Sequence, residues 1–260
     1  MNALAKPVST GTRPARPHTD VAPSWRRCQF RCTHLWLPFA AFVLLAMLLR
    51  SGDQAWADWL FAHEGHRWSL QQGFLTEVVL HRIGRGLSAA AWLAVVVGWC
   101  VAQVRPALAP WRRPLAYLWL SVLLATALVA WLKSWTSVDC PWDLARYGGQ
   151  RAYAGLFAPR PAGTPGGGCF PAGHASAGYA WLALYFFFLA ARPRWRWLGL
   201  GLGLGTGAAF GLAQQLRGAH FASHDLWTAA ICWFMALGLY WLIWLRRPGD
   251  LAGGTAAGSQ

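Results

Sequence analysis

The chain has 260 residues, of which 56% are hydrophobic and 12% are charged, with 19 tryptophans and 28 glycines. Soluble domains carry about 25% charged residues, so this composition excludes an ordinary soluble protein and predicts a polytopic membrane protein. The net charge of +14 would suit a nucleic-acid-binding protein. However, long apolar runs separate the basic residues, as membrane topology requires, so we expect membrane lipids and no nucleic acid as partners.

Residues 1–33 form a basic segment that we expect to be a disordered cytoplasmic tail. It carries one lysine and five arginines among Pro, Ser and Thr, with a single acidic residue. Cys28 and Cys32 lie in it, but one cysteine pair without further ligands is weak evidence for zinc. We expect residues 34–247 to form one membrane domain and residues 248–260 to form a short flexible tail.

Six apolar runs predict an all-α fold with six transmembrane helices, because a span needs about 20 predominantly apolar residues. The fifth run contains six glycines, which suit close helix packing in lipid. A phosphate-cradling glycine loop is excluded there, because no strand precedes it and no acidic partner follows. The runs are Leu35–Leu49, Gly86–Val104, Leu115–Leu132, Ala175–Ala191, Trp197–Leu212 and Leu226–Leu245.

The first run is short enough to be the hydrophobic region of a signal peptide, with a small-residue cleavage site at Ala55 to Ala57. The basic tail before it is long for such a peptide, so we favour a retained anchor. Residues 51–82, between the first two runs, mix aromatic and acidic residues and predict an amphipathic helical segment at the membrane interface. Its three histidines lack a regular ligand spacing, so we expect interfacial and not metal-bound positions for His63, His66 and His81.

Basic and acidic residues alternate along the connecting segments. The N-terminal tail, the loops 105–113 and 192–196, and the pair Arg246 and Arg247 are basic and nearly free of acids, and seven of the nine acidic residues fall between them. The positive-inside rule then places both termini in the cytoplasm, as in a multi-pass protein of a bacterial inner membrane. The segments that face the periplasm are then 51–82, 133–173 and 213–225.

Three polar clusters therefore meet on the outer face. They contain Lys133, His174, and the pair Arg217 and His220. The fourth and sixth helices begin at this face, so their unpaired N–H groups and positive dipole ends point there, and Ser223 is the expected cap of the sixth. Two cations, two histidines and two helix ends predict a phosphate site.

Paired histidines suit phosphate-ester hydrolysis. One histidine can attack phosphorus as a nucleophile, and a second can protonate the leaving oxygen. Cations and helix ends would stabilise the charged equatorial oxygens. This chemistry requires no metal, so we expect no cofactor.

The order and spacing of these motifs resemble the type-two phosphatidic acid phosphatase superfamily, which shares its core with vanadium haloperoxidases. The family pattern is Lys-x6-Arg-Pro, then Pro-Ser-Gly-His, then Ser-Arg-x5-His-x3-Asp. The resemblance implies that His220 is the nucleophile, His174 the general acid and Lys133 a phosphate ligand, with Ala172 and Gly173 beside the phosphate. The matching positions here are Lys133, Cys140, Pro141, Pro171, Ala172, Gly173, His174, Ala213, Gln214, His220 and His224.

Of the positions that depart from the family pattern, four bear on the phosphate and on the nucleophile. Cys140 and Gln214 stand where the family has phosphate-binding arginines, and Ala172 replaces a hydroxyl donor. His224 occupies the position of the aspartate that orients the nucleophilic histidine. If nothing compensates for these changes, the fold would be retained and catalysis would be weak or absent.

Nearby residues offer two compensations. Arg217 can restore one positive charge, and Arg146 or Arg151 can supply another. Asp225 lies one residue beyond the aspartate position, and a slight shift at the helix start would let it orient His220.

Two further interpretations stay open beside catalysis by histidine. His220 and His224 are four residues apart and could hold zinc with His174 or Asp225, although the cation Lys133 disfavours this. A transporter or a non-catalytic anion-binding protein could use the same basic cavity. It would need a second gate or inverted repeats, and ionisable residues are nearly absent inside the apolar runs. A haloperoxidase-like activity shares the site type, but a membrane setting favours a lipid phosphate.

Cys140 and Cys169 fall at the two ends of one outer loop. In an oxidising periplasm they could form a disulfide that clamps the loop beside the site, and two free thiols are the alternative. The sequence thus predicts a membrane phosphatase that hydrolyses a lipid phosphate or diphosphate at the periplasmic face through a phosphohistidine. The lipid tails would lie against the aromatic segment 56–80. Neither the identity of the lipid nor the oligomeric state follows from the sequence.

Overall fold

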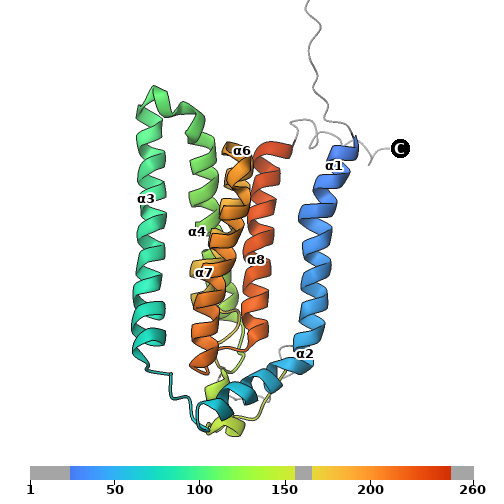
Figure 1. The fold of residues 1–260 in the computed structure, drawn as a ribbon, viewed down its shortest axis with the longest axis vertical. Helices are drawn as coiled ribbons and strands as arrows, with labels where there is room; N and C mark the ends of the chain where they lie inside the picture. The colour runs from blue at the N-terminus through green and yellow to red at the C-terminus, as the bar shows by residue number, and fades with distance from the viewer. Residues whose placement is uncertain (1–23, 156–165, 247–260) are drawn as a thin grey trace, which may run out of the picture.

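The computed structural model describes residues 24–155 and 166–246, and within these ranges the chain is helical, without a β-strand (Figure 1). Most of the expected N-terminal tail, residues 1–33, lies outside the described residues. The whole of the expected C-terminal tail, residues 248–260, lies outside them as well. The helices of the first half are α1 (Ser24–Arg31), η1 (Cys32–Trp36), α2 (Leu37–His63), η2 (Phe74–Ile83), α3 (Gly84–Val104), η3 (Pro106–Trp111), α4 (Arg112–Trp135), η4 (Pro141–Asp143) and η5 (Ala145–Tyr147). Those of the second half are α5 (Gly173–Tyr179), η6 (Ala180–Leu182), α6 (Ala183–Ala191), η7 (Pro193–Trp195), α7 (Arg196–Leu216), α8 (Ala222–Tyr240) and η8 (Trp241–Leu245).

Five helical runs in the described part of the chain are long and apolar enough to cross a membrane, which makes this a multi-pass membrane protein. The predicted fifth span corresponds to α7, a helix of 21 residues that is not among the five. Its many glycines and two glutamines contribute little apolar character, so the count of six spans stays a prediction. The five runs are Cys28–His63, Phe74–Val104, Pro106–Trp135, Gly173–Ala191 and Ala222–Leu245.

The sequence predicted that the first span ends at Leu49, but the helix that contains it is longer. Helix α2 continues without interruption to His63, because no proline or glycine pair breaks it and Asp53 finds a partner in the fold. Its last turns bend across the lower end of the bundle (Figure 1). The second span also begins earlier than predicted, because η2 leads directly into α3. The interfacial placement of residues 51–82 stays a prediction.

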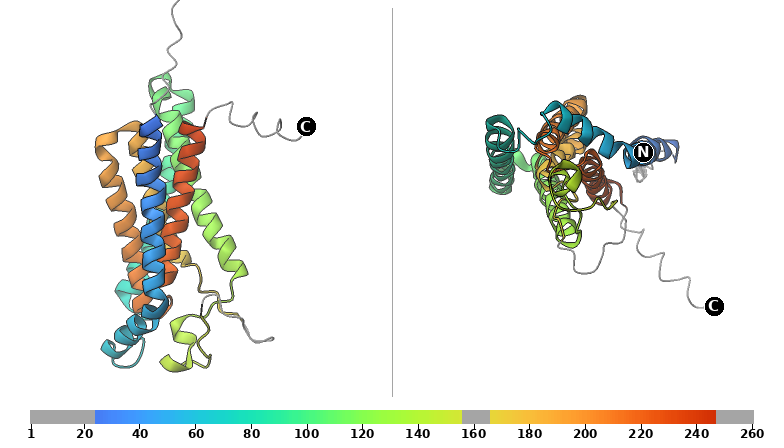
Figure 2. Two further views of the ribbon diagram at one scale, coloured as in Figure 1. Left: turned by 90° about the vertical axis from the view of Figure 1, so that its right-hand side faces the viewer. Right: turned by 90° about the horizontal axis from the view of Figure 1, so that it is seen from below.

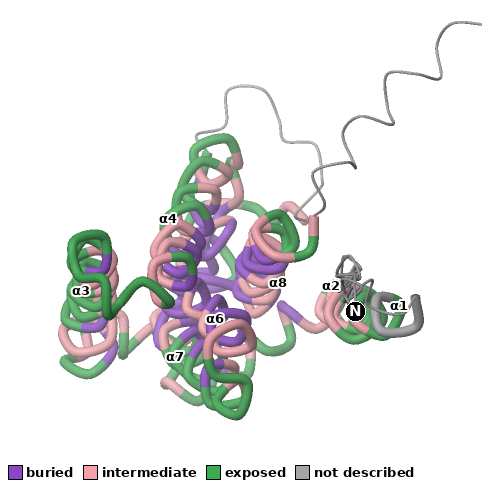
Figure 3. Tube along the Cα trace, turned by 90° about the horizontal axis from the view of Figure 1, so that it is seen from above, coloured by how far each residue is buried: buried purple, intermediate pink, exposed green. Residues whose placement is uncertain are grey.

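The buried residues gather on α4, α5, α6, α7 and α8, whereas α3 and α2 are mostly exposed (Figure 3). Helices α3 and α2 flank the middle of the bundle (Figure 2). Large apolar side chains such as Leu44, Leu48 and Leu87 are exposed on these flanking helices, as a lipid-facing surface requires. The start of α1 and the end of α8 lie at the upper end of the bundle in Figure 1, and the start of α8 lies at the lower end.

The glycines of α7 form two faces with opposite surroundings. Along the buried face, a Cβ at Gly203 would lie 2.5 Å from the backbone nitrogen of Leu182, and one at Gly207 would lie 2.1 Å from the ring of Tyr179. On the other face, a Cβ at Gly201 or Gly205 would meet nothing within 4 Å. The buried glycines therefore let α7 approach α5 and η6 at backbone distance, as small residues do in membrane helices.

Replacing Gly207 by alanine should separate α7 from α5. Forcing a methyl group into a packed contact costs about 1 to 3 kcal/mol, whereas alanine at exposed Gly205 should stabilise the helix by up to about 1 kcal/mol. Thermal unfolding in detergent would compare Gly207→Ala with the matched control Gly205→Ala. Equal midpoints for the two variants would contradict close packing through this face.

Candidate active site

The predicted polar clusters converge where α4 ends and α5 and α8 begin. His174 lies in the first turn of α5, His220 precedes α8, and His224 lies in the first turn of α8. All three side chains are buried, with 8%, 6% and 2% of their surface exposed. Ala172 is fully buried, and its carbonyl accepts a hydrogen bond from Thr228 Oγ1 at 3.4 Å, which ties the start of α5 to α8.

A tight turn after α7 places His220. Gly218 adopts a positive φ of 69°, a conformation that glycine tolerates at little cost, and a Cβ there would lie 2.4 Å from the Trp68 ring. The Ala219 N–H then donates to the carbonyl of Gln214 at 2.9 Å. These contacts hold the residue before α8 in one position, so the His220 ring enters the bundle beside His224.

The backbone of Cys169 interacts with both imidazoles of this pair. Each of His220 and His224 is hydrogen-bonded to it, and the two rings meet edge to face with centroids 5.8 Å apart. Cys169 is joined to Cys140 by a disulfide, with 5.3 Å between their Cα atoms. The disulfide-linked loop therefore lies directly against the histidine pair.

Burial lowers the pKa of His220 well below its ordinary value, and the neighbouring charges of His224 and Lys133 act in the same direction. His220 is thus neutral at physiological pH and keeps a lone pair on one ring nitrogen. A neutral imidazole is the form that can act as a nucleophile.

His174 is held by two aromatic rings and a carbonyl. Its Nε2 donates to the carbonyl of Leu80 at 3.0 Å, because a carbonyl can only accept. Its ring centroid lies 4.3 Å from that of His81 and 4.9 Å from that of Phe210. In the neutral tautomer this hydrogen bond leaves the lone pair on Nδ1.

Three imidazole nitrogens of the site have no hydrogen-bond partner among the described residues. They are the buried Nδ1 atoms of His174, His220 and His224. An unpaired buried polar atom costs about 1 to 3 kcal/mol. A cluster of three is therefore the signature of a site that a polar ligand completes.

Lys133 brings positive charge to the same place. A Cβ added at Gly173, the first residue of α5, would lie 3.4 Å from Lys133 Cδ and 3.7 Å from its Nζ. The structure thus brings together Lys133, Gly173 and the three buried histidines.

Asp225 lies apart from His220. Its Oδ2 accepts a hydrogen bond from Gln215 Nε2 at 2.5 Å, and its carboxylate packs against Gly211 of α7. The described partner of Asp225 is therefore on α7. The structure does not show the shift that would let it orient the nucleophile.

The three arginines that the sequence offered as compensation all have acidic partners. Arg217 pairs with Glu77, Arg146 with Asp58, and Arg151 with Asp139. These ion pairs offset the charge of the three arginines, whereas the charge of Lys133 acts on His220 and His224.

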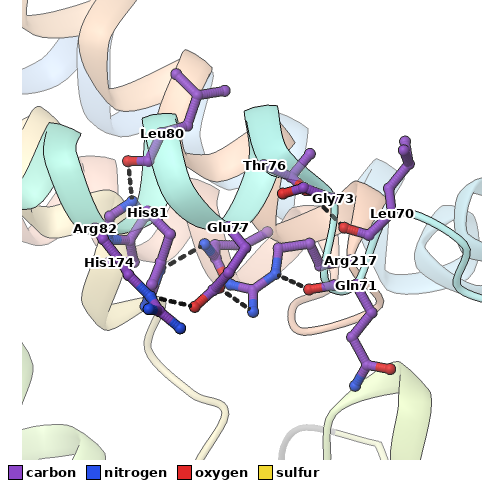
Figure 4. A network of polar contacts seen from close by, with 11 residues as sticks. Leu70, Gln71, Gly73, Thr76, Glu77, Leu80, His81, Arg82, His174 and Arg217 are labelled. Atoms are coloured by element: carbon purple, nitrogen blue, oxygen red, sulfur yellow. Dashed lines mark hydrogen bonds and ion pairs between the residues drawn. The ribbon is translucent and has the colours of Figure 1, made fainter.

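Arg217 organises a polar network beside His174 (Figure 4). It donates to the carbonyl of Gln71 at 2.7 Å and to Gln214 Oε1 at 3.0 Å, in addition to its ion pair with Glu77. Gln214 Nε2 in turn lies 2.9 Å from His81 Nδ1. His81 and Glu77 were not among the site residues expected from the sequence, although their four-residue spacing places both on one helical face.

Asp53 is a second residue that the sequence did not identify. Its Oδ1 accepts the backbone N–H of Ser223 at 2.9 Å, so a side chain of α2 caps α8. The expectation that Ser223 itself caps this helix is wrong, because Phe221 is the N-cap and its side chain makes no cap bond. The cap joins the first span to the element that carries the histidine pair.

Among the described residues, one group of three side chains could offer ligand atoms to a metal ion. These atoms lie within 4.8 Å of one another and belong to Cys140, Asp143 and Cys169. Two of these three are the disulfide pair. The zinc interpretation required His220 and His224 together with His174 or Asp225. Among the described residues, these side chains do not come together as a group of three possible ligands.

A family model described as the PAP2 superfamily matches residues 114–248. This range begins in α4 and includes α5 to α8, the elements that carry the site. No curated protein and no solved structure matches the chain.

The pKa of His220 predicts how stability depends on pH. In the unfolded chain its pKa returns to about 6.5, so the unfolded chain binds a proton that the folded chain excludes. Stability should therefore fall as the pH drops below about 6.5. Thermal unfolding between pH 8 and pH 5 should show a shallower loss for His220→Asn than for the wild type. An equal loss in both would contradict a buried neutral His220.

Proposed function

The chain belongs to the PAP2 superfamily, and on this premise we propose that it is a membrane phosphatase that hydrolyses a lipid phosphate or diphosphate through a phosphohistidine on His220. The observation that carries the proposal is the group of three buried Nδ1 atoms without partners beside Lys133. A phosphoryl group offers its phosphorus to the free Nδ1 lone pair of His220 and brings the negative charge that Lys133 balances.

The first step transfers the phosphoryl group to the protein. A ring nitrogen of neutral His220 attacks phosphorus, and the bond from phosphorus to the ester oxygen breaks. Protonated His174 gives its proton to that oxygen, while its Nε2–H stays bound to the Leu80 carbonyl. Lys133 and the backbone at Gly173 stabilise the charge on the equatorial oxygens.

In the second step His174, now neutral, accepts a proton from water. The water oxygen attacks phosphorus, the bond to His220 breaks, and inorganic phosphate leaves. The backbone of Cys169 replaces the aspartate of the family pattern as the group that orients His220. This substitution explains how His224 can occupy the aspartate position.

An apolar cavity beside His174 supports a lipid substrate. It has a volume of about 530 Å³, and its lining includes Leu80, Ile83, Leu87 and Phe210. Leu80 and Phe210 also contact the His174 ring, so a chain held in the cavity would bring its head group to the histidines. A soluble phosphate ester would leave this surface uncovered.

We place the protein in a bacterial inner membrane with the site at the periplasmic face. The positive-inside distribution of charge supports this orientation. The start of α8, which carries His224, lies at the opposite end of the bundle from the start of α1, and this agrees with the orientation (Figure 1). Water needed for the second step then comes from the periplasm.

Phosphate release from a panel of lipid phosphates tests the proposal. The panel contains phosphatidate, phosphatidylglycerol phosphate, an isoprenoid diphosphate, lipid A and a water-soluble phosphate monoester, each with chelator present. Purified wild type should release phosphate from at least one lipid. His220→Asn should abolish release, and His174→Asn should reduce it about 100-fold or more.

His63→Asn is the matched control, because His63 is exposed on α2 and its ring nitrogen bonds only to a local carbonyl. It should release phosphate as the wild type does. Release that survives His220→Asn would remove the nucleophile, and loss on chelation would favour a metal enzyme. No release from any lipid would point to an anion-binding protein.

A further inference from the structure

We propose that His81 is a phosphate-binding residue of this site, with its tautomer set by Gln214. This inference rests on the proposed function and adds a residue that the three family motifs do not contain. His81 belongs to η2, outside the matched range 114–248. Its ring lies against that of the general acid, with centroids 4.3 Å apart and planes inclined by 43°. Substrate oxygens that reach His174 are therefore within reach of His81.

The network determines which nitrogen of His81 carries the proton. Arg217 Nη1 can only donate, so the Gln214 atom it meets at 3.0 Å is the carbonyl oxygen. The amide nitrogen of Gln214 then faces His81 Nδ1 at 2.9 Å. Because an amide nitrogen only donates, Nδ1 accepts. Neutral His81 must therefore carry its hydrogen on Nε2.

Two contacts of Arg217 and the burial of Gln214 prevent the Gln214 amide from turning over. Arg217 is held by Glu77 on one side and by the carbonyl of Gln71 on the other (Figure 4). Gln214 itself is buried, with 2% of its surface exposed. Glu77, Arg217 and Gln214 are thus positioning residues that act through His81.

The Nε2–H of His81 has no hydrogen-bond partner among the described residues, and its ring is only half-buried. A donor fixed in direction and left free beside the general acid is suited to an anionic oxygen. Gln214 stands where the family pattern has an arginine, and a neutral amide cannot replace that charge. It instead fixes the hydrogen on Nε2 of a second side chain, whose ring lies against that of His174.

Two substitutions of His81 separate ligand binding from packing. Phenylalanine keeps a ring against His174 but has no N–H. Glutamine loses the ring but places an N–H donor close to the position of Nε2. Binding of inorganic phosphate, measured by ³¹P NMR line broadening on protein that also carries His220→Asn, does not depend on turnover. It therefore reports on His81 even if the proposed lipid phosphatase activity is not found.

We expect His81→Phe to weaken phosphate binding by roughly 10- to 100-fold, the range for a hydrogen bond to a charged group. We expect His81→Gln to retain most of it. In the double variant His81→Phe with Gln214→Arg, the restored arginine should recover binding. In the active enzyme, the loss should appear mainly as a higher KM, because binding of the substrate phosphate is what is removed.

Gln214→Met is a second route if the phenylalanine variant does not fold. It keeps the volume of Gln214 and removes the hydrogen bond to Nδ1, so phosphate binding should also weaken. Normal phosphate binding in His81→Phe would overturn the proposal. If binding were then lost in His81→Gln, His81 would be a packing residue. Unchanged binding in Gln214→Met would overturn the part assigned to Gln214.

Discussion

The buried glycine face of α7 is the constraint on which the site depends. At Gly207 the backbone of α7 touches the ring of Tyr179 on α5, and at Gly211 it lies against the Asp225 carboxylate on α8. His174 and His224 lie in the first turns of these two helices. The same face therefore sets the separation between His174 and the histidine pair, and a methyl group on it would change the packing of both helices.

The cations around the site differ in their partners. Arg217, Arg146 and Arg151 are each neutralised by a carboxylate, whereas Lys133 lies over the start of α5 beside the rings. Burying the unpaired nitrogens of these neutral histidines costs free energy. Favourable contacts elsewhere in the fold offset this cost.

Much of the fold and part of the site could be predicted from the sequence. Apolar runs predicted the helical membrane protein, and motif order predicted the family and the meeting of Lys133, His174 and His220. The path of α2 beyond Leu49 could not be predicted, because Asp53 is tolerated there only through its contact with Ser223, 170 residues away. The partner of Asp225 and the position of His81 were missed for the same reason, since both depend on residues of α7 and the turn after it. Roles assigned to individual residues stay predictions.

Trapping the phosphorylated protein tests the central claim most directly. The enzyme would be mixed with a lipid phosphate that it hydrolyses, quenched during turnover at alkaline pH, digested and analysed by mass spectrometry. The account predicts one phosphoryl group on the peptide that contains His220, and none in His220→Asn. Turnover without a phosphorylated peptide, or a phosphoryl group on another residue, would contradict the account.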